Sequence, residues 1–244
     1  LYRGRLREGE ELDVQGTKVK VVSILSDGIA QVRSSENLLD LAEHVGKVPL
    51  PPYMHREAEA EDTERYQTVF ASHPGSVAAP TASLNFTDDL RQQLETKGAK
   101  IAYLTLHVGL GTFLPIRTDE IEGHHMHSEY FEVPLETVDA IQRAKTAGHK
   151  VFAVGTTVAR TLEYTHEPVL HGQAAISGEA DIFIYPGYEF HVVDALVTNF
   201  HAPKSTVLML AAAFTGWDNL KAAYEVAKRK KYAFLSYGDS MLIL

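Results

Sequence analysis

The stretch "DALVTNFHAPKSTVLMLAAAF", residues 194–214, joins two apolar segments of different kinds. Residues 194–200 predict a buried strand, and residues 205–214 predict a helix. Pro203 between them suits the first turn of that helix. The polar residues in the middle therefore lie where a strand ends and a helix begins, which is where open α/β sheets bind their ligands.

The same succession of strand and helix recurs upstream. Residues 150–157, "KVFAVGTT", predict a strand that leads into a helix over residues 158–164. Thr87, Asp88 and Asp89 are expected to open a helix that ends at Gly98, and "KIAYLTLHV" predicts a buried strand over residues 100–108. This alternation indicates an α/β fold, with a mixed sheet and helices packed on it in the catalytic domain.

The N-terminal region has a different pattern. Short β-branched segments separated by turn residues predict a small β domain in residues 1–33, and we expect it to be barrel-like. A helix with Ser35 as N-cap and Gly46 as terminator is expected to follow. The proline-rich segment "KVPLPPY" then indicates a junction. We therefore expect residues 1–50 to form part of a small β domain with its connecting helix, and residues 51–244 to form the α/β catalytic domain.

The composition is that of a globular protein, because 45% of the 244 residues are hydrophobic and 23% are charged. The absence of cysteine excludes a disulfide framework, a thiolate zinc site and a cysteine nucleophile. No apolar stretch approaches the roughly 18 to 20 residues that cross a bilayer, and the N-terminus lacks a signal-peptide pattern. We expect a cytoplasmic protein that makes no membrane contact.

The formal net charge of -9 argues against non-specific nucleic-acid binding but leaves room for a local basic patch. One candidate is "AKRKKY", residues 227–232. An alternative interpretation is that its cations close a helix, where positive charge suits the C-terminal dipole. The four consecutive cations are Lys228, Arg229, Lys230 and Lys231.

Two polar clusters fall at predicted strand ends. Thr156 and Thr157 follow a strand and begin a helix, so their backbone N–H groups and hydroxyls could hold a carboxylate or phosphate, although simple helix capping also explains them. The second cluster contains Asn199, His201, Lys204 and Ser205. Capping explains the serine, but a lysine at a helix N-terminus opposes the dipole, which favours a functional site.

Histidine and carboxylate form a third cluster. His107 ends a predicted strand, and "HHMHSE" (residues 124–129) places three histidines close to Glu129. These residue types suit acid–base chemistry near neutral pH. On an extended segment His125, His127 and Glu129 would share one face, so a metal site is sterically possible, but the spacing matches no zinc motif. Near the C-terminus, Tyr237 and Asp239 flank a glycine in what is either a simple turn or part of a site.

Nine short motifs in order resemble those of the S-adenosylmethionine:tRNA ribosyltransferase-isomerases of queuosine biosynthesis. The resemblance runs from about residue 47 to the last residue. The motifs are "PLPPY" (49–53), "YQTVFA" (66–71), "GSVAAPTA" (75–82), "TLHVGLGTF" (105–113), "MHSE" (126–129), "VGTTVARTLE" (154–163), "FIYPGYEF" (183–190), "VTNFHAPKST" (197–206) and "SYGDSMLI" (236–243).

The resemblance implies transfer and isomerisation of the ribosyl part of S-adenosylmethionine onto 7-aminomethyl-7-deazaguanine at the wobble position of tRNA. The products are epoxyqueuosine in tRNA, adenine and methionine. S-adenosylmethionine is then a co-substrate, no cofactor or metal is needed, and tRNA binds partly at the basic patch. We expect a monomer.

The resemblance also implies roles for residues of the polar clusters. The acid–base candidates are His107, His127, Glu129 and His201. An anionic group is expected at Thr156, Thr157 and Arg160. Further substrate-binding candidates, for the ribose, the adenine or the target base, are Thr112, Asn199, His201, Lys204, Ser205, Tyr237 and Asp239.

Two departures from the family pattern stand out. Members generally read "PTAGLHF" where this chain reads "PTASLNF", so Ser83 replaces a glycine and Asn85 replaces a histidine. Asparagine hydrogen-bonds but does not titrate, so a proton-transfer role at this position is absent or taken over by a neighbour. Relatives also have a further N-terminal segment, and we expect that part of the family fold to be absent from this chain.

Two other functions fit parts of the sequence. A metal-dependent hydrolase would use the cluster from His124 to Glu129. A non-enzymatic RNA-binding module would use the basic patch, although such a module usually has a larger cationic surface than four residues.

Overall fold

The computed structural model describes residues 5–25, 30–109 and 126–244. The chain divides into two compact units, Leu1–Val48 and Pro49–Leu244. Within the described residues, no helix is long and apolar enough to span a membrane.

The first unit contains a three-stranded antiparallel sheet in the order β1 (Glu11–Val14), β2 (Thr17–Ile24) and β3 (Ala30–Ser34). Val19 and Val21 alternate with exposed residues on β2 and form the buried face of this sheet. The three described strands agree with a small β domain. Its closure into a barrel stays a prediction.

A single helix, α1 (Leu38–Val45), follows the small sheet. Its N-cap is Asn37, whose side chain accepts a hydrogen bond from the Leu39 amide, so the expected cap at Ser35 was wrong by two residues. Asparagine is as good a cap as serine, which is why the sequence did not separate the two. Gly46 ends the helix as expected.

The second unit has a mixed α/β architecture, as predicted, and its described residues form two small sheets. One is antiparallel, in the order β4 (Thr105–His107), β5 (Glu129–Val133) and β7 (Ile176–Ala180). The other has the order β6 (Phe152–Val154), β8 (Ala195–Asn199) and β9 (Ser240–Ile243), with β6 parallel and β9 antiparallel to β8.

The strand expected over residues 100–108 is reduced to β4. Only Thr105–His107 finds a partner strand, and its partner is β5. Before it, the carbonyl of Tyr103 accepts a hydrogen bond from the Thr137 hydroxyl at 2.5 Å, so a side chain replaces the ladder there.

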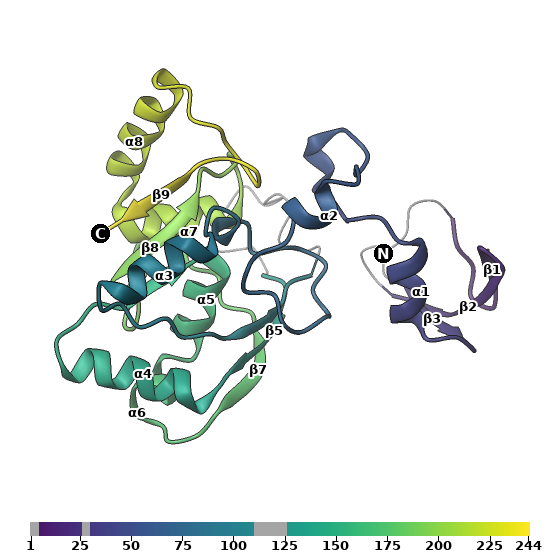
Figure 1. Ribbon diagram of the computed structural model, residues 1–244, viewed down its shortest axis with the longest axis horizontal. Coiled ribbons are helices and arrows are strands. Elements are labelled where there is room, and N and C mark those ends of the chain that lie inside the picture. The colour runs from purple at the N-terminus through teal and green to yellow at the C-terminus, as the bar shows by residue number, and fades with distance from the viewer. Residues whose placement is uncertain (1–4, 26–29, 110–125) are drawn as a thin grey trace. The chain divides into compact units, whose positions relative to one another are not determined.

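Helices complete the second unit, and Figure 1 shows α4 beside α6 in one part of it and α8 beside α7 in another. Helix α3 begins after its N-cap Thr87, as expected. Pro203 does not start a helix, because Lys204 has φ 57° and the helix begins only after the N-cap Ser205. The helices are α2 (Asp62–Arg65), α3 (Asp88–Thr96), α4 (Leu135–Thr146), α5 (Thr156–Tyr164), α6 (His166–His171), α7 (Thr206–Thr215) and α8 (Trp217–Arg229), with 3-10 turns η2 (Pro52–Met54) and η3 (Thr81–Ser83).

The core of the second unit lies between the sheets and these helices. Helix α7 is apolar around most of its circumference, and Leu208, Leu210 and Ala211 on it are buried together with Leu196 of β8. An almost wholly apolar helix of this kind needs burial on several sides. The sequence pattern of residues 194–214 therefore fixes a strand and a helix at the centre of the unit.

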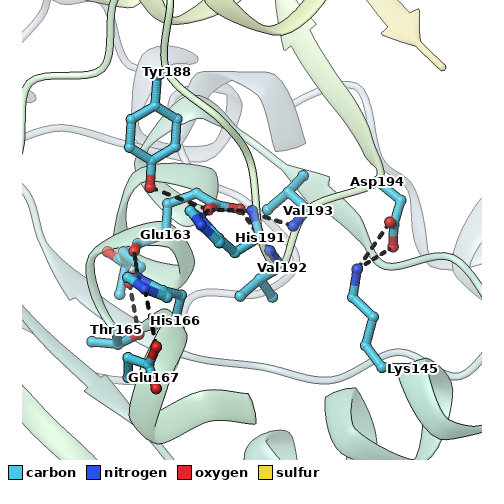
Figure 2. A network of polar contacts seen from close by, with 11 residues as sticks. Lys145, Glu163, Thr165, His166, Glu167, Tyr188, His191, Val192, Val193 and Asp194 are labelled. Atoms are coloured by element: carbon cyan, nitrogen blue, oxygen red, sulfur yellow. Dashed lines mark hydrogen bonds and ion pairs between the residues drawn. The ribbon is translucent and has the colours of Figure 1, made fainter.

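A buried carboxylate ties the loop before β8 to helix α5 (Figure 2). The side chain of Glu163 is fully buried, and its oxygens accept hydrogen bonds from the backbone N–H groups of His191, Val192 and Val193 at 2.8 to 3.0 Å. The hydroxyl of Tyr188 also donates to it, at 3.3 Å. A buried charge is tolerated only with such partners, so Glu163 fixes the path of this loop.

Replacing Glu163 by glutamine tests whether these hydrogen bonds stabilise the fold. The amide keeps one acceptor oxygen but turns an NH₂ group toward backbone donors, so we expect the free energy of unfolding to fall by about 2 to 4 kcal/mol. Urea denaturation measures the change. The matched control is Glu167→Gln on the neighbouring helix, where the side chain is 74% exposed and the expected change is within about 0.5 kcal/mol. A similarly small loss of unfolding free energy in Glu163→Gln would contradict the stabilising role of Glu163.

Candidate active site

The parallel pairing of β6 and β8 brings two of the predicted polar clusters to one sheet edge. Val154 is in register with Val197, and the Gly155 amide donates to the Val197 carbonyl at 2.9 Å. Helix α5 begins at Thr156 and helix α7 at Thr206, each a short distance past its strand. Both helix N-termini therefore open at the carboxyl ends of neighbouring parallel strands, where ligands bind in α/β sheets.

The turn η3 covers this edge. The Thr81 hydroxyl donates to the Asn199 side-chain oxygen at 3.0 Å, so the asparagine predicted as a substrate group also holds η3 in place. Gly155 has φ 106°, a conformation that favours glycine, and Ala82 of η3 lies beside it. Three motifs that are far apart in the sequence meet here.

A pocket lies between these helix ends. Thr156, Thr157 and Arg160 from α5 and Thr206 from α7 supply its polar lining. Its cavity volume is about 20 Å³, which is room for about one water molecule. Its remaining lining residues are Met126, Ile182, Phe183, Ile184, Val207 and Leu210. An apolar pocket with a few convergent polar groups is the usual form of a small-molecule site.

A buried ion pair supports the pocket. Arg160 is 5% exposed and Glu129 of β5 is also 5% exposed, and the guanidinium donates to the Glu129 carboxylate. The structure thus joins the predicted anion-binding arginine to the predicted acid–base carboxylate. The Nε of Arg160 is buried and makes no hydrogen bond within the described part of the chain. Glu129 holds the guanidinium through Nη2, and Nε is unsatisfied within the described residues.

Two histidines of the third cluster, His107 and His127, lie on or next to the β4–β5 pair. His107 on β4 pairs with Tyr130 on β5, and their rings stack with centroids 5.5 Å apart. His127 precedes β5 and is exposed. The Glu129 side chain is buried and binds Arg160, whereas His127 is exposed, and the face expected for His125, His127 and Glu129 stays a prediction.

His201 lies apart from the pocket lining. Its Nε2 shares a 2.8 Å hydrogen bond with the Thr198 hydroxyl, and its backbone N–H donates to the Tyr224 hydroxyl at 2.7 Å. Burial lowers the pKa of His201 to about 4. The ring is therefore neutral at pH 7, which leaves it a hydrogen-bonding group rather than a proton donor.

Lys204 and Ser205 have separate environments. Lys204 is exposed, with its backbone at φ 57°, in the turn before α7. Because it precedes the N-cap, its charge does not sit in the first helical turn as expected. Ser205 caps the helix by accepting from the Leu208 amide, and its hydroxyl donates to the Ala202 carbonyl. Capping accounts for the serine.

Tyr237 belongs to a separate group of polar side chains around Asp62, here called the Asp62 cluster. The Tyr237 hydroxyl donates to Asp62 at 2.8 Å, and burial together with this carboxylate raises the pKa of Tyr237 to about 12. Arg56 binds Asp62 through two hydrogen bonds, which hold the pKa of Asp62 well below its usual range. Asp239 is exposed and accepts from the Ala233 amide at 2.7 Å, which closes the turn before β9.

Sequence reasoning missed the Asp62 cluster. The stretch from Glu57 to Glu64 is mostly acidic in sequence, as an exposed segment would be, yet Asp62 is buried and bound by Arg56 and Tyr237. The only indication of this cluster in the sequence was that Tyr237 lies in a family motif, and the motif does not identify the residue that Tyr237 contacts. A pairing across 175 residues cannot be inferred from local pattern.

The two departures from the family motif are accommodated. Ser83 is buried, and its hydroxyl donates to the Pro80 carbonyl at 2.6 Å. The Asn85 amide donates to the Gly238 carbonyl at 3.0 Å and to the Ser240 hydroxyl at 2.8 Å. Asn85 thus holds η3 to the turn before β9.

The basic patch lies at the end of α8. The helix ends at Arg229, so the cations do close a helix, and all four are exposed. Lys228 pairs with Glu225 at 2.6 Å. Thr112, His124 and His125 lie outside the described residues. In the part of the chain that is described, no group of three or more metal-ligating side chains is placed to hold an ion.

The low pKa of His201 predicts a pH effect on stability. In the unfolded chain histidine titrates near 6.5, so the folded state is favoured above that pH, and this stabilisation is lost as pH falls from about 6.5 towards about 4. Urea denaturation at pH 7 and pH 4.5 should show a smaller decline in His201→Gln than in the wild type. The control is His149→Gln, which removes an exposed histidine. If the free energy of unfolding of His201→Gln declined with pH as much as that of the wild type, the assignment of a neutral His201 ring would be wrong.

The comparisons with known proteins agree with these motifs. The family model described as a queuosine biosynthesis protein matches residues 2–243. The chain is 55% identical over 247 residues to the S-adenosylmethionine:tRNA ribosyltransferase-isomerase of Pelodictyon phaeoclathratiforme, covering 100% of this chain and 72% of the relative. It is 57% identical over 247 residues to the protein of that name from Chlorobium chlorochromatii, with the same coverage.

A solved structure is similar as well. The crystal structure of S-adenosylmethionine tRNA ribosyltransferase from Thermotoga maritima matches with a TM-score of 0.56 and 32% identity, over 98% of this chain and 67% of that one. Neither a metal-dependent hydrolase nor a non-enzymatic RNA-binding module receives support from these relatives. The chain belongs to the family of queuosine biosynthesis proteins, together with relatives named S-adenosylmethionine:tRNA ribosyltransferase-isomerase.

Proposed function

We propose that the protein transfers and isomerises the ribosyl moiety of S-adenosylmethionine onto 7-aminomethyl-7-deazaguanine at the wobble position of tRNA. The products are epoxyqueuosine in tRNA, adenine and methionine. The observation that supports this best is the pocket at the ends of β6 and β8, where buried Arg160 meets two helix N-termini. The family motifs "VGTTVARTLE" and "VTNFHAPKST" supply most of its polar lining.

The proposed ligand of Thr156, Thr157 and Arg160 is the methionine carboxylate. Backbone N–H groups at a helix N-terminus favour an anion, and a guanidinium binds a carboxylate through two parallel hydrogen bonds. Glu129 occupies part of the Arg160 guanidinium and fixes its orientation, whereas Nε has no partner in the described chain. Glu129 in this proposal orients the arginine in addition to its expected acid–base role.

Ribosyl transfer also requires a base to remove a proton next to the sulfonium and a group to assist the departure of adenine. His127 is the proposed base, because it is exposed and forms no hydrogen bond or ion pair with the described residues. Glu129 is a weaker candidate for the base, since its carboxylate is stabilised by Arg160. His107 and neutral His201 act as further polar groups of the site.

Several residues are proposed to bind ribose, adenine or the target base. Lys204 is exposed beside the pocket helix and is available to a polar substrate group. Asn199 acts chiefly by holding η3 at the sheet edge, and Tyr237 acts chiefly by binding Asp62. Thr112, Ser205 and Asp239 stay in the proposed binding set.

The proposed tRNA contact combines the basic patch, Lys228 to Lys231, with capture of an extruded base from a single-stranded loop. Phosphate contacts of this kind position the RNA without reading its sequence. A tRNA substrate is consistent with a monomeric, cytoplasmic enzyme, and both of these properties stay predictions.

Adenine and methionine release tests the proposed function directly. The protein is incubated with S-adenosylmethionine and tRNA that carries the deazaguanine precursor, and both products are quantified. Release that depends on the precursor base is the expected result. No release of either product would refute the proposed activity.

The same assay separates the two proposed substrate sites. Thr157→Val removes a hydroxyl from the pocket and should raise KM for S-adenosylmethionine by about tenfold with the KM for tRNA unchanged, as expected for loss of a hydrogen bond to a charged group. Lys230→Gln combined with Lys231→Gln should do the reverse and reduce the salt dependence of tRNA binding.

Each variant has a matched control. Thr215→Val makes the same change at the far end of α7, and Lys97→Gln with Lys100→Gln removes two exposed cations elsewhere. Both controls should leave both KM values unchanged. If Thr157→Val raised only the KM for tRNA, or if the Lys230 and Lys231 variant bound tRNA normally, the corresponding site assignment would be wrong.

A further inference from the structure

The ring of His107 is held between two neighbours. On one side the Tyr130 ring stacks on it, with an interplanar angle of 22°. On another side lies Gly75, where an added Cβ would stand 2.6 Å from both Nδ1 and Cε1 of the imidazole. Real Cβ contacts are essentially never this short, so only glycine permits the approach. Gly75 also has φ 144°, which glycine adopts readily and other residues rarely do.

A hydrogen-bonded clamp keeps Gly75 over the ring. The residue after it, Ser76, accepts from the Val108 amide at 2.9 Å and donates to the Ala78 carbonyl at 2.8 Å. The Val77 amide donates to the Val108 carbonyl at 3.1 Å. Val108 follows His107 directly, so the "GSVA" segment is fastened to the same stretch of backbone that carries the histidine.

This packing seals one nitrogen of the imidazole. Nδ1 of His107 is buried, and no hydrogen-bond partner for it exists among the described residues. A neutral imidazole carries one proton, on Nδ1 or on Nε2. Because an orphaned N–H in a buried site is rarer than an orphaned acceptor, the packing favours the tautomer with its proton on Nε2.

We propose that His107 serves the transfer reaction as a hydrogen-bond donor through Nε2, and that Gly75 is the positioning residue that imposes this tautomer. This inference rests on the proposed function. With its proton on Nε2 and its lone pair sealed under Gly75, the ring has no free lone pair for removing a proton. The base is therefore another group, and His107 pairs with an acceptor on the substrate, such as an adenine ring nitrogen or a ribose oxygen.

Two substitutions at His107 separate donor from base. The side-chain amide of glutamine reaches about as far as Nε2, whereas that of asparagine reaches only about as far as Nδ1. We expect His107→Gln to keep kcat/KM within about tenfold of the wild type and His107→Asn to lose about a hundredfold or more, with both variants folded. If glutamine lost as much as asparagine and one ionisation vanished from its pH profile, His107 would be a base and the proposal would fail.

Gly75→Ala tests the positioning role. Its matched control is Gly98→Ala, which introduces the same kind of strained backbone at φ 90° but has no atom within 4 Å of the added Cβ. We expect kcat to fall at least tenfold in Gly75→Ala, with the KM for tRNA unchanged, and to stay normal in Gly98→Ala. Normal turnover in Gly75→Ala, or an equal loss in both variants, would overturn the role of Gly75.

The tautomer of His107 can be measured independently of enzyme activity. Nitrogen-15 NMR of the imidazole distinguishes a protonated Nε2 from a protonated Nδ1 in the free protein. We expect His107 to show the proton on Nε2, and a proton on Nδ1 would overturn the inference. If the wild type released no adenine in the assay above, the proposed function would fail, but the NMR result would still decide the tautomer.

Discussion

The buried ion pair between Glu129 and Arg160 is the contact on which the arrangement of the site depends. It joins strand β5 of the antiparallel sheet to helix α5, which follows β6 of the mixed sheet. Removing one partner would leave an uncompensated buried charge, so the pair constrains both elements at once. Strand β5 also pairs with β7, and the segment after β7 lines the pocket through Phe183 and Ile184. The ion pair therefore fixes these apolar residues relative to Arg160.

Two further buried or half-buried carboxylates support the sheet edge near this pair. Glu163 and Asp194 are satisfied by backbone amides and a lysine, and they fix the segment that leads into β8. Among the predicted site residues, Arg160 lines the pocket and keeps a buried Nε without a hydrogen-bond partner in the described part of the chain, and His127 is exposed. Polar groups that are already oriented cost little reorganisation at the moment of reaction, which is the advantage that the proposed site would gain from this support.

Local pattern predicted the parts of this structure that depend on local chemistry. The strand and helix in residues 194–214, the start of α3 after Thr87 and the strand-to-helix turn before Thr156 follow from apolar periodicity and capping preferences. The predicted start of α1 was wrong because Ser35 and Asn37 are equally good N-caps. The predicted first turn of α7 was wrong because no signal in the sequence indicated the positive φ of Lys204. The pairs Glu129 with Arg160 and Asp62 with Tyr237 are long-range, and pattern alone could not identify either.

A crystal structure of the protein with S-adenosylmethionine bound is the most direct test of the central claim that the α5 end is the substrate site. We expect the methionine carboxylate within hydrogen-bond distance, about 2.7 to 3.2 Å, of Arg160 or of the backbone amides at Thr156 and Thr157. A carboxylate bound elsewhere, with the pocket between α5 and α7 empty, would contradict that claim.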